Sequence, residues 1–406
     1  MRFFTKRLTL ALLALATLPL LAHRWRVHHA WQAMLETGQA LEQSIAQLDA
    51  TRPVLYGEAQ AGNAHEQYAL AISMLNEGIQ EDWLEVQRAR EDASPEASTL
   101  RDALVADNAE ALAVLKLGAH ALDAEYALDW DGEQLPRAPR MMGSRNLMAL
   151  CVLAADKLLD EGHQDLAADT LLDGLQMAGD TMRCPMLIGQ MIGCALLDMG
   201  AGNALVEEGL LDKFEPAQLK RLGIGMELLQ AGLPSLDAAY DTELAWFIRS
   251  SEKATRYRDF SLEGDLEDWL VVARYGFSTR LMIAEYVEAA MAWRGLEQAR
   301  GERSWVEWNE EWDRFAAGMN GTSNPLWGVV GPSYRSAEIS RRSQLTRFNM
   351  TRCAIEYRLS GETLDVRDHF GDQVSVEVLG DRVRFSSVGP DEAEGQREWY
   401  SLQISS

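Results

Sequence analysis

The residues best suited to chemistry form an acidic cluster in the C-terminal half of the chain. Its members are Glu302, Glu307, Glu310, Glu311 and Asp313, and they alternate with Trp305, Trp308 and Trp312. Paired carboxylates can act as general acid and base when burial raises the pKa of one of them. Alternation of acids with large apolar residues is also the pattern of a helix with one solvated face and one packed face. We expect the packed helix, and we keep Glu307 and Glu311 as the catalytic candidates of a hydrolase.

Other motifs that define a reaction are absent from the sequence. It contains no HExxH, no ExxH pair, no GxSxG and no glycine-rich phosphate-binding loop of the GxxxxGKS or GxGxxG type. Its histidines are scattered, at positions 23, 28, 29, 65, 120, 163 and 369. We therefore predict no catalytic residue and no cofactor, and we favour a protein that is not an enzyme.

The four cysteines indicate neither a zinc site nor a disulfide framework. Cys151, Cys184, Cys194 and Cys353 lie far apart and form no CxxC pair. Cysteine is among the residues most often buried as a free thiol. We expect buried thiols, with a disulfide as the alternative in an oxidising compartment.

The charge balance excludes a nucleic-acid partner. The chain has 62 acidic and 38 Lys and Arg residues, and its formal net charge is -24. Nucleic-acid affinity depends on cations that displace counterions from phosphates, and no basic stripe with interleaved aromatic residues is present. The basic residues Arg24 and Arg26 are better explained by a position next to a membrane.

The N-terminal segment carries the strongest signal. Basic residues precede an uncharged apolar run at positions 8–22, and His23, Arg24, Trp25 and Arg26 follow it. As a helix, this run is about 22 Å long, whereas a bilayer core is about 30 Å thick. We expect a single-pass anchor in a bacterial inner membrane, with most of the chain in the periplasm. The alternative is a cleaved signal peptide and a secreted or periplasmic protein, although Leu20 fits a cleavage site poorly.

Composition divides the chain into five segments. They are the anchor or signal segment 1–26, a helical region 27–125, a loop 126–143, a helical domain 144–323, and a helix with a β tail at 324–406. Glycine and proline punctuate the loop. Apolar residues recur at helical spacing in the helical segments, beginning with Trp31, Met34, Leu35, Leu41, Ile45 and Leu48. We therefore predict a mainly α fold of irregular helical domains.

One helical hairpin stands out in the predicted helical domain. Residues 146–178 give two helices joined at Gly162, with small residues at Ala154 and Ala168 and leucines at 158, 171 and 175. This pattern resembles a tetratricopeptide hairpin. Because only one clear copy is present and repeat arrays need about three units, we interpret it as a local packing motif.

The pattern changes near the C-terminus. A last long helix is predicted from about Tyr334 to Leu359 and ends before Gly361. Alternating valines at 374, 376 and 378, a turn at Gly380 and Asp381, and Val383 with Phe385 predict a β-hairpin. Residues 400–404 supply a third strand. The tail is thus a helix with an antiparallel hairpin or meander.

This tail resembles the C-terminal part of type II secretion pseudopilins. The resemblance rests on the long helix, the segment DHFGD at 368–372, the hairpin, and FSSVGPD at 385–391. A group of membrane-anchored bacterial helical proteins to which no activity is assigned is similar too. It shares an Asn-Pro start like Asn324-Pro325 and a stretch like LIGQMIG at 187–193. The N-terminus lacks the processing pattern of a pilin, so membership of a filament is not implied.

The resemblance also suggests a metal site. The corresponding region of pseudopilins holds calcium, and Asp391, Glu392 and Glu394 offer the hard oxygen ligands that calcium prefers. The sequence has Glu392 where the family has glycine. These three residues are therefore calcium candidates, weighed against simple solvation of an acidic loop.

Three functions remain open at this point. The first is a non-enzymatic, membrane-tethered interaction or scaffold protein that holds other proteins of the envelope. The second is an envelope hydrolase that uses the clustered carboxylates, and the third is an accessory of a type II secretion-like system. The position of Glu307 and Glu311 discriminates the first two, because catalysis requires them to converge in a pocket.

Overall fold

The fold is mainly α-helical, with a small antiparallel sheet near the C-terminus, which confirms the predicted fold class. The structure is a computed structural model. It describes residues 2–48, 51–76, 78–91, 94–126, 128, 141–257, 278–298, 305–320, 324–362, 364, 367–371, 373–380, 382–387, 389 and 400–405.

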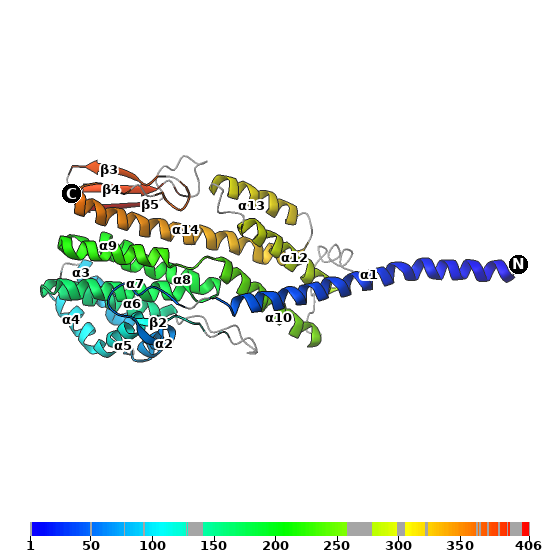
Figure 1. The fold of residues 1–406 in the computed structure, drawn as a ribbon, viewed down its shortest axis with the longest axis horizontal. Helices are drawn as coiled ribbons and strands as arrows, with labels where there is room; N and C mark the ends of the chain where they lie inside the picture. Colours follow the sequence, from blue (N-terminus) through cyan, green and yellow to red (C-terminus); the bar gives the residue numbers. More distant parts are fainter. Residues whose placement is uncertain are drawn as a thin grey trace. The chain divides into compact units, whose positions relative to one another are not determined.

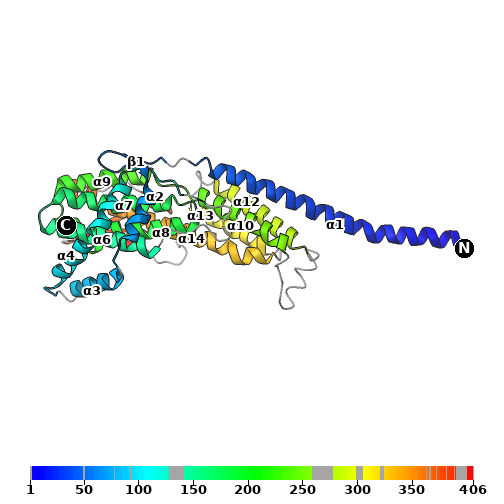
Figure 2. The same ribbon diagram turned by 90° about the horizontal axis from the view of Figure 1, so that it is seen from below.

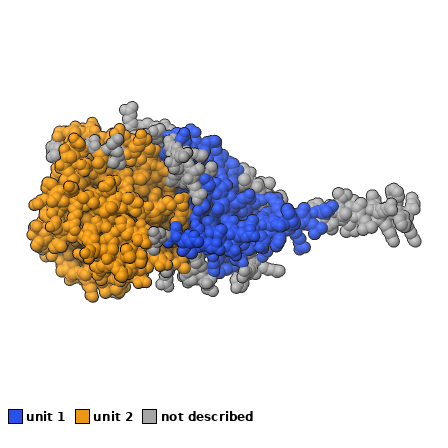
Figure 3. All heavy atoms as spheres, in the orientation of Figure 1, with its two compact units in different colours: residues 1–48, 240–335 blue, residues 49–239, 336–406 orange. Residues whose placement is uncertain are grey.

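The chain forms two compact units, each built from segments that are distant in sequence (Figure 3). Unit 1 comprises residues 1–48 and 240–335, and unit 2 comprises residues 49–239 and 336–406. These boundaries differ from those of the five predicted segments, because composition varies along the chain whereas the units are defined by contacts in space. Helices α10 (Asp237–Tyr257) and α14 (Pro325–Ser360) contribute residues to both units.

Unit 1 is a helical unit that includes the long first helix. Its other members are α12 (Thr279–Gln298), α13 (Trp305–Asn320), most of α10 and the start of α14. Helix α1 (Arg2–Ile45) packs through Trp31, Met34, Leu41 and Ile45, all of which are buried. These four belong to the face that helical spacing predicts. Of the other two predicted members, Leu35 is half-buried, and Leu48 lies after the end of the helix and is exposed.

The buried tryptophans of unit 1 form an aromatic core. Trp293, Trp305, Trp308 and Trp312 are all buried, and the ring centroids of Trp293 and Trp312 lie 4.3 Å apart in an edge-on arrangement. Large aromatic rings stabilise a core because each buries a large apolar area. The prediction that these residues pack inside the protein is confirmed.

The N-terminal part of α1 lacks this packing. In both views it extends beyond α10, α12 and α13 (Figures 1 and 2). Leu18, Leu20, Leu21 and Trp25 are 62%, 66%, 61% and 64% exposed. Among the helices that the structure describes, none meets the combined requirement of length and hydropathy for crossing a bilayer. The anchor at residues 8–22 stays a prediction.

Unit 2 is a larger helical assembly around α7. Its N-terminal helices are α2 (Ala64–Ser73), α3 (Ile79–Glu91), α4 (Ala97–Asp107) and α5 (Ala109–Ala119). They are followed by α6 (Met141–Asp160), α7 (Gln164–Met182), α8 (Leu187–Leu197), the π-helix η1 (Asp198–Glu207), the short 3-10 helix η2 (Leu210–Lys213) and α9 (Pro216–Ala231). Every residue of α7 from Leu171 to Met182 is buried.

The predicted hairpin of two helices is present in unit 2 as α6 and α7. The connection contains Gly162 at φ 79°, a left-handed conformation that favours glycine. Ala154, Ala168, Leu171 and Leu175 are buried as the pattern predicts, whereas Leu158 is half-buried.

Two local features of unit 2 depart from the sequence prediction. Strands β1 (Gln60–Asn63) and β2 (Ala121–Asp123) form a short parallel pair that no alternating pattern announces. The sequence pattern predicts one helix at about 98–119, but the structure has two helices there, α4 and α5, separated at Asn108. The side chain of Asn108 donates to the carbonyl of Leu104 and accepts from the backbone N–H of Asn76. Side-chain bonds of this kind compete with a continuous helix.

The C-terminal part of unit 2 follows the prediction closely. Strands β3 (Ser375–Leu379), β4 (Arg382–Ser387) and β5 (Tyr400–Ser405) form an antiparallel sheet in the order β3-β4-β5. Val383, Phe385 and Ile404 face the core beside α14, where the ring centroids of Phe385 and Tyr357 lie 6.2 Å apart.

The last helix begins earlier than predicted. Helix α14 starts at Pro325, after Asn324, whose side-chain oxygen accepts from the backbone N–H of Leu326 at 3.1 Å. Asparagine before a helix and proline at its first position are both favourable. The backbone stays helical through Gly331 and Pro332, which precede the predicted start at Tyr334.

Candidate functional site: an apolar groove in unit 2

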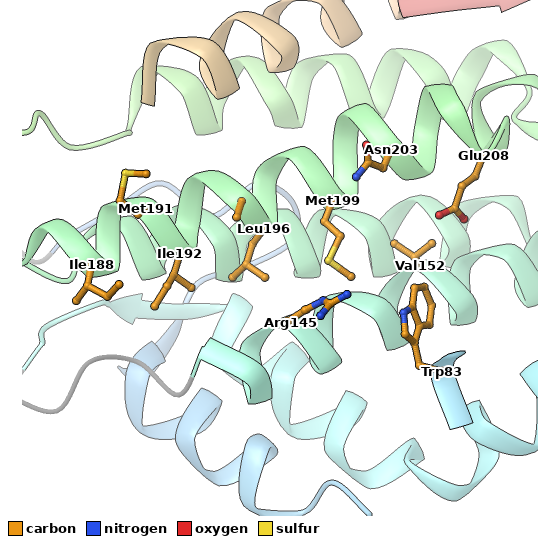
Figure 4. A pocket seen from close by; sticks show the side chains of 11 residues that line it. Trp83, Arg145, Val152, Ile188, Met191, Ile192, Leu196, Met199, Asn203 and Glu208 are labelled. Atoms are coloured by element: carbon orange, nitrogen blue, oxygen red, sulfur yellow. The ribbon is translucent and has the colours of Figure 1, made fainter. Parts of the chain in front are cut away.

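Unit 2 contains an apolar groove with a volume of about 450 Å³. One wall is α8 continued by η1, and the other is formed by α6 and α3 (Figure 4). In Figure 4 the side chains of Ile188, Ile192 and Leu196 point from α8 toward α6, from which Arg145 points back. The remaining lining residues are Trp83, Val152, Met191, Ala195, Met199, Asn203 and Glu208.

The first wall is a helix with two different faces. The groove face carries residues 188, 191, 192, 195, 196 and 199, which recur at helical spacing. The opposite face carries glycines. A Cβ on Gly193 would lie 2.7 Å from the carbonyl oxygen of Ala178, and a Cβ on Gly200 would lie 3.0 Å from Leu175. Small residues therefore let α8 and η1 approach α7 closely and turn the bulky residues toward the groove.

A π-helix forms the second half of this wall. The backbone N–H of Glu208 donates to the carbonyl of Asn203, five residues earlier, at 2.8 Å. Arg347 of α14 holds this segment through ion pairs with Asp198 at 2.6 Å and Glu207 at 2.8 Å. Irregular π-helical turns are frequent at functional sites. Arg347 of α14 thus stabilises the π-helical backbone of η1, which contributes Met199 and Asn203 to the groove.

Arg145 is the distinctive polar group of the groove. Its side chain is exposed, and it has neither an ion pair nor a hydrogen bond among the described residues. Asn203 accepts a hydrogen bond from Arg347 at 3.1 Å through its side-chain oxygen. A mostly apolar cavity with a few polar groups at fixed positions is typical of binding sites.

Several strongly perturbed ionisable groups lie in the core around α7. Arg52 Nε lies 2.9 Å from Asp180 Oδ1, and Tyr68 donates to Asp180 Oδ2 at 2.6 Å. Gln176 donates to the same carboxylate at 3.0 Å. Burial raises the pKa of Asp180 to about 6, against the opposing influence of these partners. Asp180 is thus fully buried among its hydrogen-bond partners and does not line the groove.

A second carboxylate of α7 has a similar environment. Tyr56 donates to Asp173 Oδ1 at 2.6 Å, and His120 Nε2 lies 3.5 Å from the same oxygen. Asp173 raises the pKa of His120, while burial raises the pKa of Asp173 itself. Neither Asp173 nor His120 lines the groove. The two groups therefore stabilise the core without reaching the candidate site.

The carboxylates singled out from the sequence lie in unit 1. Glu307 is exposed and Glu311 is half-buried on α13, whereas Trp305, Trp308 and Trp312 are buried. Glu307 and the tryptophans therefore occupy different faces of the helix, as a helix with one solvated face requires.

Two further groups of residues were singled out from the sequence, the calcium candidates and the cysteines. The calcium candidates Asp391, Glu392 and Glu394 lie outside the described residues. Within the part of the chain that is described, no group of three histidine, cysteine or acidic side chains is placed to hold a metal ion. Cys151, Cys184, Cys194 and Cys353 are buried free thiols, as predicted.

Sequence reasoning missed the groove because its lining looks like a core pattern. The apolar positions between 188 and 199 have the spacing of any buried helix face, and nothing local distinguishes them. The segment LIGQMIG was singled out by resemblance alone. Its glycines were the available signal, since small residues on one face of a helix indicate close packing of that face against a neighbouring helix.

The fold and the groove define a mainly α-helical protein with a candidate binding site. Comparison with known proteins adds no relative, since no family model matches this chain and no curated protein or solved structure is significantly similar to it.

Proposed function

We propose that this chain is a non-enzymatic, membrane-tethered interaction protein of a bacterial envelope, which holds a partner protein in the groove of unit 2. The observation that carries this proposal is the composition of the groove. Its lining is mainly apolar, Ile188 is 44% exposed, and Arg145 has no described partner. Uncovered apolar surface with a few polar groups is the usual character of a surface that binds another molecule.

The position of the ionisable groups supports binding over catalysis. A general acid or base must reach a substrate, so its side chain must face a cavity. Asp173 and Asp180 are buried and engaged by neighbouring side chains, and Glu307 faces solvent. Glu208 lines the groove, but no second carboxylate accompanies it among the described lining residues. The groove offers a cation at Arg145, which suits recognition of a carboxylate on a partner.

The proposed tether is the N-terminal segment at residues 8–22. Its support is the uncharged apolar run with basic residues on both sides. Leu18, Leu20, Leu21 and Trp25 of α1 are exposed, and the first buried position among the described side chains is Trp31. The exposed leucines at the end of this segment need an apolar environment, and a lipid bilayer supplies one.

Site-specific photocross-linking tests the role of the groove. A photoreactive residue at Ala195, which is exposed and lines the groove, should give one reproducible protein adduct in native membranes. The same residue at Leu166, which is 51% exposed and lies outside the groove lining, serves as the control. A Met199→Glu substitution should abolish the adduct at Ala195. Equal adducts from both positions, or an adduct that survives Met199→Glu, would contradict the proposed function.

A further inference from the structure

Unit 1 contains a second cavity whose character differs from that of the groove. Its volume is about 490 Å³, and it is lined by residues of α1 and of the start of α12. We name it the basic pocket, after the four lining side chains His23, Arg24, His28 and Arg280. Of the described residues that line it, none is acidic. The basic lining contrasts with the acidic composition of the whole chain, whose net charge is -24.

The cations of the basic pocket are not committed to carboxylates. Elsewhere in unit 1, Arg26 pairs with Glu285 and Arg249 pairs with Glu42. Arg24 has no hydrogen bond or ion pair among the described residues. The Arg280 guanidinium lies over the ring of Trp31 at 5.1 Å and has no carboxylate partner in the described part of the chain. Uncompensated cations around one cavity favour an anionic ligand.

The chemistry of the lining fits a phosphate group. Arginine presents several N–H donors in a planar fork that matches phosphate geometry. The imidazoles of His23 and His28 each carry at least one N–H donor. The Trp31 ring beneath Arg280 restricts the guanidinium, which reduces the conformational entropy lost when a ligand binds. The basic pocket is thus lined by N–H donors from α1 and α12, and no carboxylate is among its described lining residues.

The basic pocket follows directly after the exposed apolar part of α1. Leu20 is 66% exposed, and Arg24 lies four residues later, on the same face of the helix. Trp25, at 64% exposure, is a residue type that accumulates where a bilayer meets water. A ligand at this position would contact the apolar segment on one side and the cations on the other. A membrane phospholipid has an apolar part, its acyl chains, and an anionic part, its phosphate.

We propose that the basic pocket binds the phosphate of an anionic phospholipid headgroup, an inference that rests on the proposed membrane tether. Lipid phosphate is favoured over free phosphate because the exposed leucines of α1 adjoin the cations and would contact the acyl chains. Basic residues beside a membrane-associated helix attract anionic lipids in this way.

Native mass spectrometry of the full-length chain in detergent micelles tests the proposal. The chain is titrated with phosphatidylglycerol or with phosphatidylcholine of the same acyl chains. We expect one phosphatidylglycerol to bind with clear preference. Arg24→Gln and Arg280→Gln should each weaken this binding roughly fivefold. Both side chains are exposed, so these variants should keep the thermal stability of the wild type.

The matched control is Arg26→Gln. It makes the same change in charge on the same helix, but Arg26 pairs with Glu285 and does not line the basic pocket. Its phosphatidylglycerol affinity should stay within about twofold of the wild type, since a single surface ion pair contributes little. If Arg26→Gln weakens binding as strongly as Arg24→Gln, the effect is one of net charge and the pocket assignment is wrong.

Other outcomes separate this inference from the proposed function. Equal binding of both lipids, or binding of inorganic phosphate as tightly as phosphatidylglycerol, overturns the headgroup assignment even if the chain is recovered in membranes. Recovery of the chain outside the membrane fraction in cells contradicts the tether. In that case the preference for phosphatidylglycerol can still be measured, because the titration uses the purified chain in micelles.

Discussion

Arg52 Nε and Asp180 Oδ1 lie 2.9 Å apart in unit 2, and both side chains are fully buried. Arg52 also donates to the backbone carbonyls of Gly118 at 2.7 Å and Ala119 at 3.1 Å. A buried ion pair has to offset a large desolvation cost, and it does so only when the remaining donors and acceptors are satisfied. This pair therefore connects the segment after residue 50 with α5 and α7.

Replacing Arg52 with methionine should destabilise unit 2 strongly. The change leaves Asp180 buried without its cation, which costs about 3–5 kcal/mol. Without Arg52 the pKa of Asp180 should rise further above that of the unfolded chain, so the carboxylate is protonated at low pH. The loss should therefore be larger at pH 8 than at pH 5, as measured by urea denaturation at both pH values.

The double variant Arg52→Met with Asp180→Leu provides the control. Removing both charges eliminates the uncompensated carboxylate, so the double variant should be more stable than Arg52→Met alone. A double variant whose loss equals the sum of the two single losses would mean that the two residues act independently.

A Gly193→Ala substitution should destabilise the wall of the groove. The added Cβ would lie 2.7 Å from the carbonyl oxygen of Ala178, which is backbone and cannot move aside easily. We expect a loss of about 1–3 kcal/mol, measured by chemical denaturation. Gly223→Ala in α9 is the matched change, since its nearest neighbour is a methyl group of Ile355 at 3.5 Å. This control should gain up to about 1 kcal/mol.

Two histidines should make unit 2 sensitive to acid. Burial lowers the pKa of His65 and of His369 to about 4, assisted by the nearby cations Arg52 and Arg341 respectively. The unfolded chain binds these protons with a pKa of about 6.5. Each histidine therefore contributes stability that is present above pH 6.5 and is lost as the pH falls toward 4. At pH 5 the expected loss is about 2 kcal/mol per histidine.

Glutamine variants isolate these contributions. His65→Gln and His369→Gln carry no proton in this range, so each should flatten the dependence of unfolding free energy on pH between 7 and 5. His163→Gln is the control, because His163 is exposed at the start of α7. Identical pH profiles for the wild type and His65→Gln would show that His65 is not protonated on unfolding.

The π-helix of the groove should loosen when Arg347 is removed. Arg347 contacts Asp198, Asn203 and Glu207 of η1, and its side chain is largely buried. In Arg347→Met, hydrogen exchange should accelerate in residues 198–207 more than in α9, because local opening reports local contacts. Arg358→Met, which loses a more exposed pair with Asp212 at 2.7 Å, should leave exchange in η1 unchanged.

Much of this fold could be predicted because local signals agree with the tertiary structure. The faces of α1 and α13, the turn at Gly162 and the strands after residue 374 all have clear periodicity or turn residues. The break at Asn108 had no local signal, because a contact from Asn76 fixes it. The parallel pairing of β1 with β2 likewise depends on segments that meet only in the fold.

The candidate sites were harder to predict for the same physical reason. A groove-lining helix and a core helix have the same apolar spacing, and exposure of Ile188 depends on what the rest of unit 2 leaves uncovered. The basic pocket combines α1 with Arg280, which is distant in sequence. The acidic cluster around Glu307 was conspicuous in the sequence. The exposure of Glu307, Glu310 and Asp313 and the burial of the tryptophans follow from the two faces of α13.

Purification of the tagged full-length chain from its native membranes tests the central claim most directly. Mass spectrometry would identify both the N-terminus of the chain and the proteins bound to it. We expect a membrane-bound chain that retains residues 8–22 and carries a reproducible partner, and we expect the Met199→Glu variant to lose this partner. A chain that begins near His23, is recovered outside the membrane and carries no partner would contradict the claim.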